Sequence, residues 1–229
     1  MIASLVDVLP VVLLGGLLGL DVVTFPQAMV SRPIVAATVA GAFIGNALAG
    51  LTMGATLELL ALGMLPFGAS KYPEWGSASV VGGVLYASQA MNSPSALPTS
   101  LLAALFTAVV SGWSMIKLRR LNASRAARMR SALDSGSADA IVGLQIFGLT
   151  ADFIRGGAVT LGAMLLFRPV VPAIVGTWHS NPLYSRGLVV AISVAVAAGA
   201  IWKIFRVVPG AKILFAAGLA CGIGLILLR

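Results

Sequence analysis

Long apolar runs that do not alternate with polar residues constrain this chain more than any other feature of its sequence. Of the 229 residues, 59% are hydrophobic and only 10% are charged, whereas soluble domains carry about 25% charged residues. One soluble core cannot bury that much apolar surface. Runs of this length favour membrane-spanning α-helices, unlike the alternating segments of about ten residues found in outer-membrane β-barrels. We therefore expect an all-α integral membrane protein.

The runs predict about six to eight membrane segments, at about 20 residues for a full span. The segments 51–65 and 78–91 are short and rich in small residues, which favours two arms of a re-entrant helical hairpin over full spans. No soluble domain and no long linker is expected, so residues 1–229 are predicted to form a single transmembrane domain. The predicted segments are 2–23, 33–49, 51–65, 78–91, 94–118, 140–170, 187–205 and 212–228.

Two stretches are predicted to interrupt the later segments. The sequence TADFIRGG at 150–157 favours a short interfacial helix, with Asp152 and Arg155 three residues apart and able to pair on one face. Residues 168–187 contain several turn-forming residues and are expected to form a link.

The net charge of +8 has an uneven distribution along the chain. Six of the 15 Lys and Arg side chains lie within residues 117–130, which contain no acid. Basic residues of this kind favour a cytoplasmic loop and also suit contact with lipid headgroups. They do not line a polar face with aromatic residues between them, so we do not expect nucleic-acid binding.

One carboxylate, Glu58, lies within the apolar stretch Leu51–Gly68. An exposed charge at the centre of a bilayer costs about 2.5 kcal/mol or more, so such an acid is by default a candidate substrate or ion site. The alternative is a structural carboxylate that caps a broken helix or pairs with Arg32 or Lys71. The residues expected to break the helix and shape a hairpin are Gly54, Gly63 and Pro66.

Motifs that would indicate catalysis are absent from the sequence. It contains no Walker A loop, no HExxH and no CxxC pair. One histidine, His179, and one cysteine, Cys221, make a zinc site implausible and exclude an intramolecular disulfide. We therefore expect no catalytic residue, no metal and no cofactor, and interpret Cys221 as a packing residue.

Polar residues near membrane depth in the first third of the chain favour non-covalent binding of a neutral polyol, since carboxylates accept hydrogen bonds from hydroxyl groups and amides both donate and accept. An alternative applies to Asp21 and Gln27, because polar residues are ordinary near segment ends. The set comprises Asp21, Thr24, Gln27, Asn46, Thr52, Thr56 and Glu58.

Several short motifs resemble one family. Leu20-Asp21 is followed by Gln27 and Ser31-Arg32-Pro33, then by IGNALAG at 44–50 and GATLELLALGMLPFG at 54–68. The last motif is close to a GGTLEMIALG type of signature. Together they resemble the membrane IIC subunit of mannose/fructose/sorbose-type sugar phosphotransferase systems (PTS). The chain departs from the family pattern at Asn46 and at 72–75.

The resemblance implies a permease subunit of a phosphoenolpyruvate-dependent PTS in the bacterial inner membrane, which moves a hexose-type sugar but does not phosphorylate it. Its implied partners are a membrane IID subunit, with which IIC forms trimers of heterodimers, and the cytoplasmic IIB and IIA subunits. The predicted sugar ligands are Glu58 at the tip of the hairpin, Gln27, Thr56 and Asp21.

Two other hypotheses remain at this point. The chain could be an ion-coupled secondary transporter of a small polar solute, with Glu58 and Asp152 as coupling acids. It could also be a membrane assembly subunit that has lost the binding site. Accumulation of a sugar phosphate would separate the first interpretation from the ion-coupled transporter, and neighbouring genes for IIA, IIB and IID would argue against the assembly subunit.

Overall fold

The computed structural model describes residues 5–22, 24–63, 72–89, 93–178 and 181–227, and every regular element within them is an α-helix. The all-α prediction is thus confirmed for the described residues. The helices are α1 (Leu5–Leu20), α2 (Pro33–Phe43), α3 (Ala47–Ala61), α4 (Trp75–Ala87), α5 (Ala96–Arg128), α6 (Arg130–Asp134), α7 (Ala138–Thr177), α8 (Pro182–Val207) and α9 (Ala211–Leu227).

Within the described residues, three helices, α5, α7 and α8, are long and apolar enough to cross a membrane. Each also leaves large apolar side chains exposed, such as Phe106, Leu165 and Leu188. Apolar residues on the outer surface are what contact with lipid requires, because hydrocarbon cannot satisfy polar groups. The shorter apolar helices α1, α2, α3 and α9 complete the set, and the chain is a multi-pass membrane protein.

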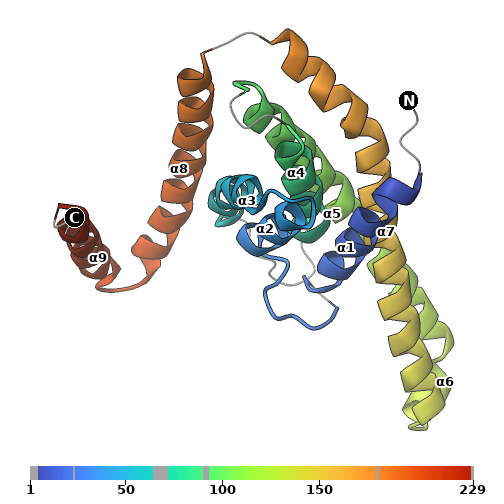
Figure 1. Cartoon of the computed structure of the whole chain (residues 1–229). Coiled ribbons are helices and arrows are strands. Elements are labelled where there is room, and N and C mark those ends of the chain that lie inside the picture. Colours follow the sequence, from blue (N-terminus) through green and yellow to red (C-terminus); the bar gives the residue numbers. More distant parts are fainter. Residues whose placement is uncertain (1–4, 23, 64–71, 90–92, 179–180, 228–229) are drawn as a thin grey trace.

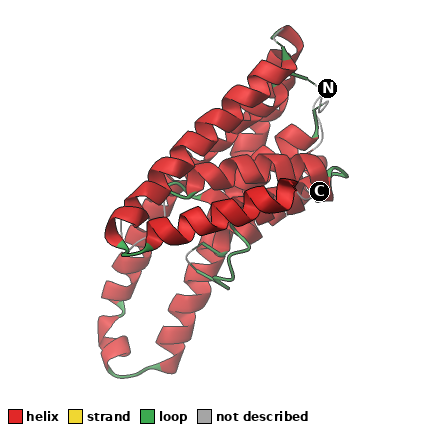
Figure 2. Ribbon diagram, turned by 90° about the vertical axis from the view of Figure 1, so that its left-hand side faces the viewer, coloured by secondary structure: helices red, strands yellow, loops and turns green. Residues whose placement is uncertain are grey.

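The four short helices α1 to α4 pack together beside α5 and α7, whereas α8 lies against α3 and is followed by α9 (Figures 1 and 2). Helix α4 is at the centre of this arrangement, and all of its residues are buried. Its small side chains permit this position. A Cβ atom on Gly83 would lie only 2.7 Å from the carbonyl oxygen of Ala37 in α2, so the two helices can approach closely only because glycine is present.

The observed hairpin pairs α3 with α2, which differs from the predicted pairing of 51–65 with 78–91. The turn between them is short because Gly45 adopts a positive φ of 89°, which glycine tolerates without steric cost. Asn46 then caps α3 by accepting a hydrogen bond from the Ala49 amide at 3.1 Å. The segment predicted as the second arm, 78–91, instead contributes the buried helix α4.

The basic stretch 117–130 is helical rather than a loop. Helix α5 continues to Arg128, and α6 and the start of α7 follow it at the same end of the molecule (Figure 1). Arg, Lys, Ala and Leu all have high helix propensity, so the helix can continue beyond its apolar, membrane-spanning part.

Helix α7 is continuous over 40 residues, so the predicted interruption at 150–157 is wrong. The predicted link at 168–187 is present but shorter than expected, because α7 ends at Thr177 and α8 begins at Pro182. The glycines of TADFIRGG serve helix packing, since a Cβ on Gly156 would lie 3.2 Å from the Gly15 carbonyl oxygen in α1. The helix also includes Pro169 and Pro172 and ends only at Thr177. Prolines are tolerated within membrane helices when neighbouring groups satisfy the freed carbonyls. His179 lies outside the described residues, and Cys221 is exposed on α9 rather than packed.

Candidate functional site

The segment that joins α1 to α2, residues 21–32, is named here the 21–32 loop, and Asp21 determines its shape. One carboxylate oxygen of Asp21 accepts the Ala28 amide at 2.6 Å. The other accepts the Ser31 amide at 2.8 Å and the Ser31 hydroxyl at 2.7 Å. Burial raises the pKa of the Asp21 carboxyl, but the hydrogen bonds from Ser31, Ala28 and Val30 outweigh it and hold the pKa below its ordinary value. Both oxygens of Asp21 therefore support the loop.

Glu58 lies where the loop enters α2. Its Oε1 pairs with the guanidinium of Arg32, and its Oε2 accepts the Ile34 amide at 3.2 Å in the first turn of α2. A helix N-terminus carries unpaired amides and a partial positive charge, so a carboxylate is favoured there. Because the hairpin turn lies at Gly45, Glu58 is at the open end of the hairpin rather than at its predicted tip.

The Arg32–Glu58 pair remains accessible. The side chain of Arg32 is 31% exposed and that of Glu58 is 17% exposed. A polar ligand can therefore reach both groups without first breaking a fully buried pair. Glu58 thus has the structural role that the sequence left open, because it caps a helix and pairs with Arg32. The partial exposure of both side chains also permits contact with a ligand.

The other predicted site residues lie in different environments. Gln27 is exposed on the 21–32 loop with a φ of 58°. Thr56 is buried, and its hydroxyl donates to the Thr52 carbonyl of its own helix at 2.9 Å. A Cβ on Gly54 would lie 2.7 Å from the Pro33 carbonyl oxygen, whereas one on Gly63 would meet only Ala200 at 3.4 Å. Pro66 and Lys71 lie outside the described residues.

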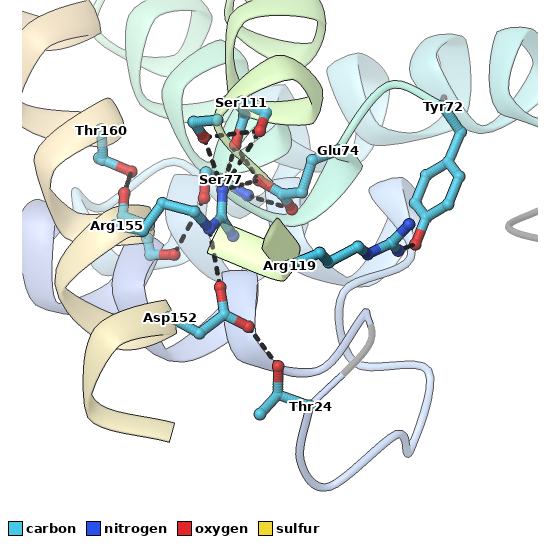
Figure 3. Close-up of polar contacts among 12 residues, drawn as sticks. Thr24, Tyr72, Glu74, Ser77, Ser111, Arg119, Asp152, Arg155 and Thr160 are labelled. Atoms are coloured by element: carbon cyan, nitrogen blue, oxygen red, sulfur yellow. Dashed lines mark hydrogen bonds and ion pairs between the residues drawn. The ribbon is translucent and has the colours of Figure 1, made fainter. Parts of the chain in front are cut away.

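A second polar cluster, here called the Arg155 network, is buried where α1, α4, α5 and α7 meet (Figure 3). Arg155 Nε donates to Asp152 Oδ1 at 2.7 Å, which confirms the predicted pair on α7. Arg155 Nη1 donates to the Ser111 hydroxyl at 2.8 Å and lies 4.0 Å from Glu74 Oε2. The Ser111 hydroxyl in turn donates to Glu74 at 2.6 Å. The guanidinium therefore links α7 to α5 and to the start of α4.

Glu74 is the functional candidate that sequence reasoning missed. Tyr and Trp beside a charged residue, as at 72–75, are typical of a membrane interface, but the side chain of Glu74 is completely buried. It caps α4 by accepting the Ser77 amide at 3.1 Å. Glutamate is not one of the usual N-cap residues, so the sequence carries no standard helix-start signal for this role.

Among the described residues, no group of three or more His, Cys, Asp or Glu side chains is placed to hold a metal ion. The two polar clusters differ in what they can do. The 21–32 loop with Glu58 presents exposed donors and acceptors. The Arg155 network is instead a buried set of paired charges, in which Nη2 of Arg155 has no hydrogen-bond partner within the part of the chain that the structure describes.

Comparisons with known proteins support one family. The family model described as the PTS system sorbose-specific IIC component matches residues 5–200. The sorbose-specific EIIC component of Klebsiella pneumoniae is 41% identical over 54 residues, which is 24% of this chain and 20% of that protein. The fructose permease IIC component of Bacillus subtilis is 37% identical over 59 residues, covering 26% of this chain and 22% of the relative. The mannose-specific EIIC component of Escherichia coli is 37% identical over 54 residues, covering 24% and 20%.

These alignments thus span about a fifth of the length of the curated relatives. A solved structure described as a membrane protein matches this fold with a TM-score of 0.75 at 19% identity, over 100% of this chain and 96% of the other. At that identity the likeness shows the fold alone. Because the family model covers most of the sequence, the chain belongs to the family of PTS sorbose-specific IIC components.

Proposed function

We propose that this chain is the sugar-translocating IIC subunit of a phosphoenolpyruvate-dependent PTS, with residues 1–229 forming one permease domain. The observation that carries the proposal is the family match over residues 5–200. In this role the chain moves the sugar across the bacterial inner membrane, while partner subunits supply the phosphoryl group.

The proposed substrate is a hexose-type sugar, the class to which sorbose, fructose and mannose belong. Glu58, Arg32 and Gln27 are the proposed contacts, because a carboxylate accepts hydrogen bonds from sugar hydroxyls, a guanidinium donates, and an amide does both. The partial exposure of Arg32 and Glu58 supports this assignment. Asp21 and Thr56 are assigned indirect roles. Asp21 shapes the loop that carries Gln27, and Thr56 contributes to the packing of α3, which carries Glu58.

The proposed partners are a membrane IID subunit, assembled with IIC as a trimer of heterodimers, and the cytoplasmic IIB and IIA subunits. We place the basic end of the molecule, residues 117–130, in the cytoplasm, where the sugar meets IIB. The positive-inside tendency supports this orientation, since these residues carry six positive charges and no acid.

Uptake of radiolabelled mannose, fructose and sorbose tests the proposal. Cells producing the chain with the PTS subunits of its host should accumulate one of these sugars as its phosphate. Accumulation should require phosphoenolpyruvate and should withstand an uncoupler of the proton gradient. Accumulation of free sugar that collapses on uncoupling would instead support an ion-coupled secondary transporter and would overturn the proposal.

A further inference from the structure

Asp152 makes hydrogen bonds to two separate parts of the molecule with its two oxygens. Oδ1 accepts from Arg155 within α7 at 2.7 Å, and Oδ2 accepts from the hydroxyl of Thr24 in the 21–32 loop (Figure 3). The Asp152 side chain is 1% exposed. The loop is thereby connected to a membrane-spanning helix that is 128 residues away in sequence.

The position of Asp152 is itself determined by the rest of the Arg155 network. Arg155 is held from α5 by the hydroxyls of Ser111 at 2.8 Å and Ser114 at 3.2 Å. Glu74, at the start of α4, lies on the other side of Ser111. Three helices therefore fix the carboxylate that Thr24 contacts.

Stability alone is a weak reason for such a network. Burying ions removes their hydration, and well-packed apolar residues of similar size are often equally stabilising. What the charges do provide is a fixed direction for each hydrogen bond. One of the hydrogen bonds that Asp152 accepts comes from Thr24, in the loop that carries Gln27 and ends at Arg32.

We propose that Asp152 and Thr24 are positioning residues, which hold the 21–32 loop against α7 so that Gln27 and Arg32 meet the sugar in a fixed arrangement. This inference rests on the proposed sugar-binding function. A loop that is ordered before the ligand arrives does not lose its freedom on binding, so the ligand binds more tightly. Loss of the anchor therefore weakens sugar binding without removing a direct contact.

The substitution Thr24→Val tests the anchor, because it removes the hydroxyl and keeps the side-chain shape. Losing a hydrogen bond to a carboxylate should make the amides of residues 24–32 exchange about tenfold faster with deuterium. The same variant should raise the KM for uptake of mannose, fructose or sorbose by about tenfold and leave the maximal rate unchanged. Thr24→Ser, which restores the hydroxyl, should behave like the wild type in both measurements.

Thr107→Val is the matched control. Thr107 is buried, whereas Thr24 is partly exposed, and the Thr107 hydroxyl donates to the Ala103 carbonyl of its own helix at 2.7 Å rather than to another segment. It should change neither exchange in the loop nor KM. Asp152→Ala completes a double-mutant cycle. In the Asp152→Ala background, Thr24→Val should cause little further increase in loop exchange or in KM. If Asp152→Ala does not fold, the Thr24 variants test the proposal without it.

Three results would overturn the proposal: loop exchange unchanged in Thr24→Val, Thr24→Ser as impaired as Thr24→Val, or faster exchange with an unchanged KM. A different result marks failure of the proposed function. If the wild-type chain takes up none of the three sugars, that function is wrong, and the exchange experiment still decides whether Thr24 and Asp152 anchor the loop.

Discussion

Glu58 has a structural role in the fold and is also a proposed contact for the sugar. It accepts the Ile34 amide and pairs with Arg32, yet both charged side chains remain partly exposed. We expect Glu58→Ala to abolish sugar uptake, because the sugar loses an acceptor and Arg32 loses the partner that orients it. Uptake assays should be read together with the amount of protein in the membrane, which we expect to be unchanged.

Asp134→Ala is the matched control for Glu58→Ala. Asp134 also pairs with an arginine, Arg130, at 3.6 Å, but the two side chains are 71% and 83% exposed. Exposed pairs of this kind contribute about 0–1 kcal/mol, so Asp134→Ala should transport normally. Wild-type uptake by Glu58→Ala would contradict the site assignment.

Asp21 is expected to affect stability even without sugar. Its carboxylate accepts three hydrogen bonds from Ala28 and Ser31, and Asp21→Asn replaces one of the two acceptor oxygens with a donor. Leaving such groups unpaired costs about 1–3 kcal/mol. Thermal unfolding of the purified protein should therefore show a lower midpoint for Asp21→Asn. A variant as stable as the wild type would mean that the loop does not depend on this carboxylate.

At the residue scale, the sequence indicates which residues are unusual more readily than it indicates which residues they contact. Glu58 stood out because a lone acid in an apolar run needs compensation, and Arg32 was already a possible partner. Glu74 was overlooked, because its neighbours Tyr72 and Trp75 suggested an interface. Its contact with Ser111 spans 37 residues, and no local pattern encodes a contact of that range.

Element length and pairing were harder to predict than element type. The apolar runs indicated helices, and helices are present. The turn between α2 and α3 uses the positive φ of Gly45, whereas Gly156 lies inside α7 and packs closely against Gly15 without breaking the helix. Glycine is compatible with a turn, with a helix break and with close packing, so only the neighbouring element decides among them.

The contact between α2 and α3 should be sensitive to Gly54. A Cβ at this position would lie 2.7 Å from the Pro33 carbonyl oxygen and 2.9 Å from the Ile34 Cα. Both are backbone atoms and cannot rotate away, so Gly54→Ala should force the helices apart at a cost of about 1–3 kcal/mol. A lower unfolding midpoint in detergent would show this effect.

Gly162→Ala in α7 provides the control, since nothing lies within 4 Å of its added Cβ. Alanine is the better helix former by about 1 kcal/mol, so this variant should be at least as stable as the wild type. Equal effects of the two substitutions would argue against close packing at Gly54.

At the scale of the whole molecule, the length of α7 predicts which parts lie on opposite sides of the membrane. A helix of 40 residues is about 60 Å long, whereas the hydrocarbon core of a bilayer is about 30 Å thick. We therefore expect the two ends of α7 to emerge on opposite sides. Figure 1 shows the basic end and α6 at one end of α7, and the connection to α8 at the other. If the positive-inside tendency holds, the start of α8 faces outward.

Cysteine labelling tests this orientation in a Cys221→Ala parent, because Cys221 is the only cysteine and is exposed. Ser135→Cys places a thiol on exposed residue 135 after α6, and Tyr184→Cys places one in α8 where the native side chain is 76% exposed. An impermeant maleimide should label Tyr184→Cys in right-side-out vesicles and Ser135→Cys only after permeabilisation. The parent should remain unlabelled in both conditions. The reverse pattern would place the basic end outside, where the proposed cytoplasmic IIB subunit could not reach it. Labelling of both sites from one side would show that α7 does not cross the membrane.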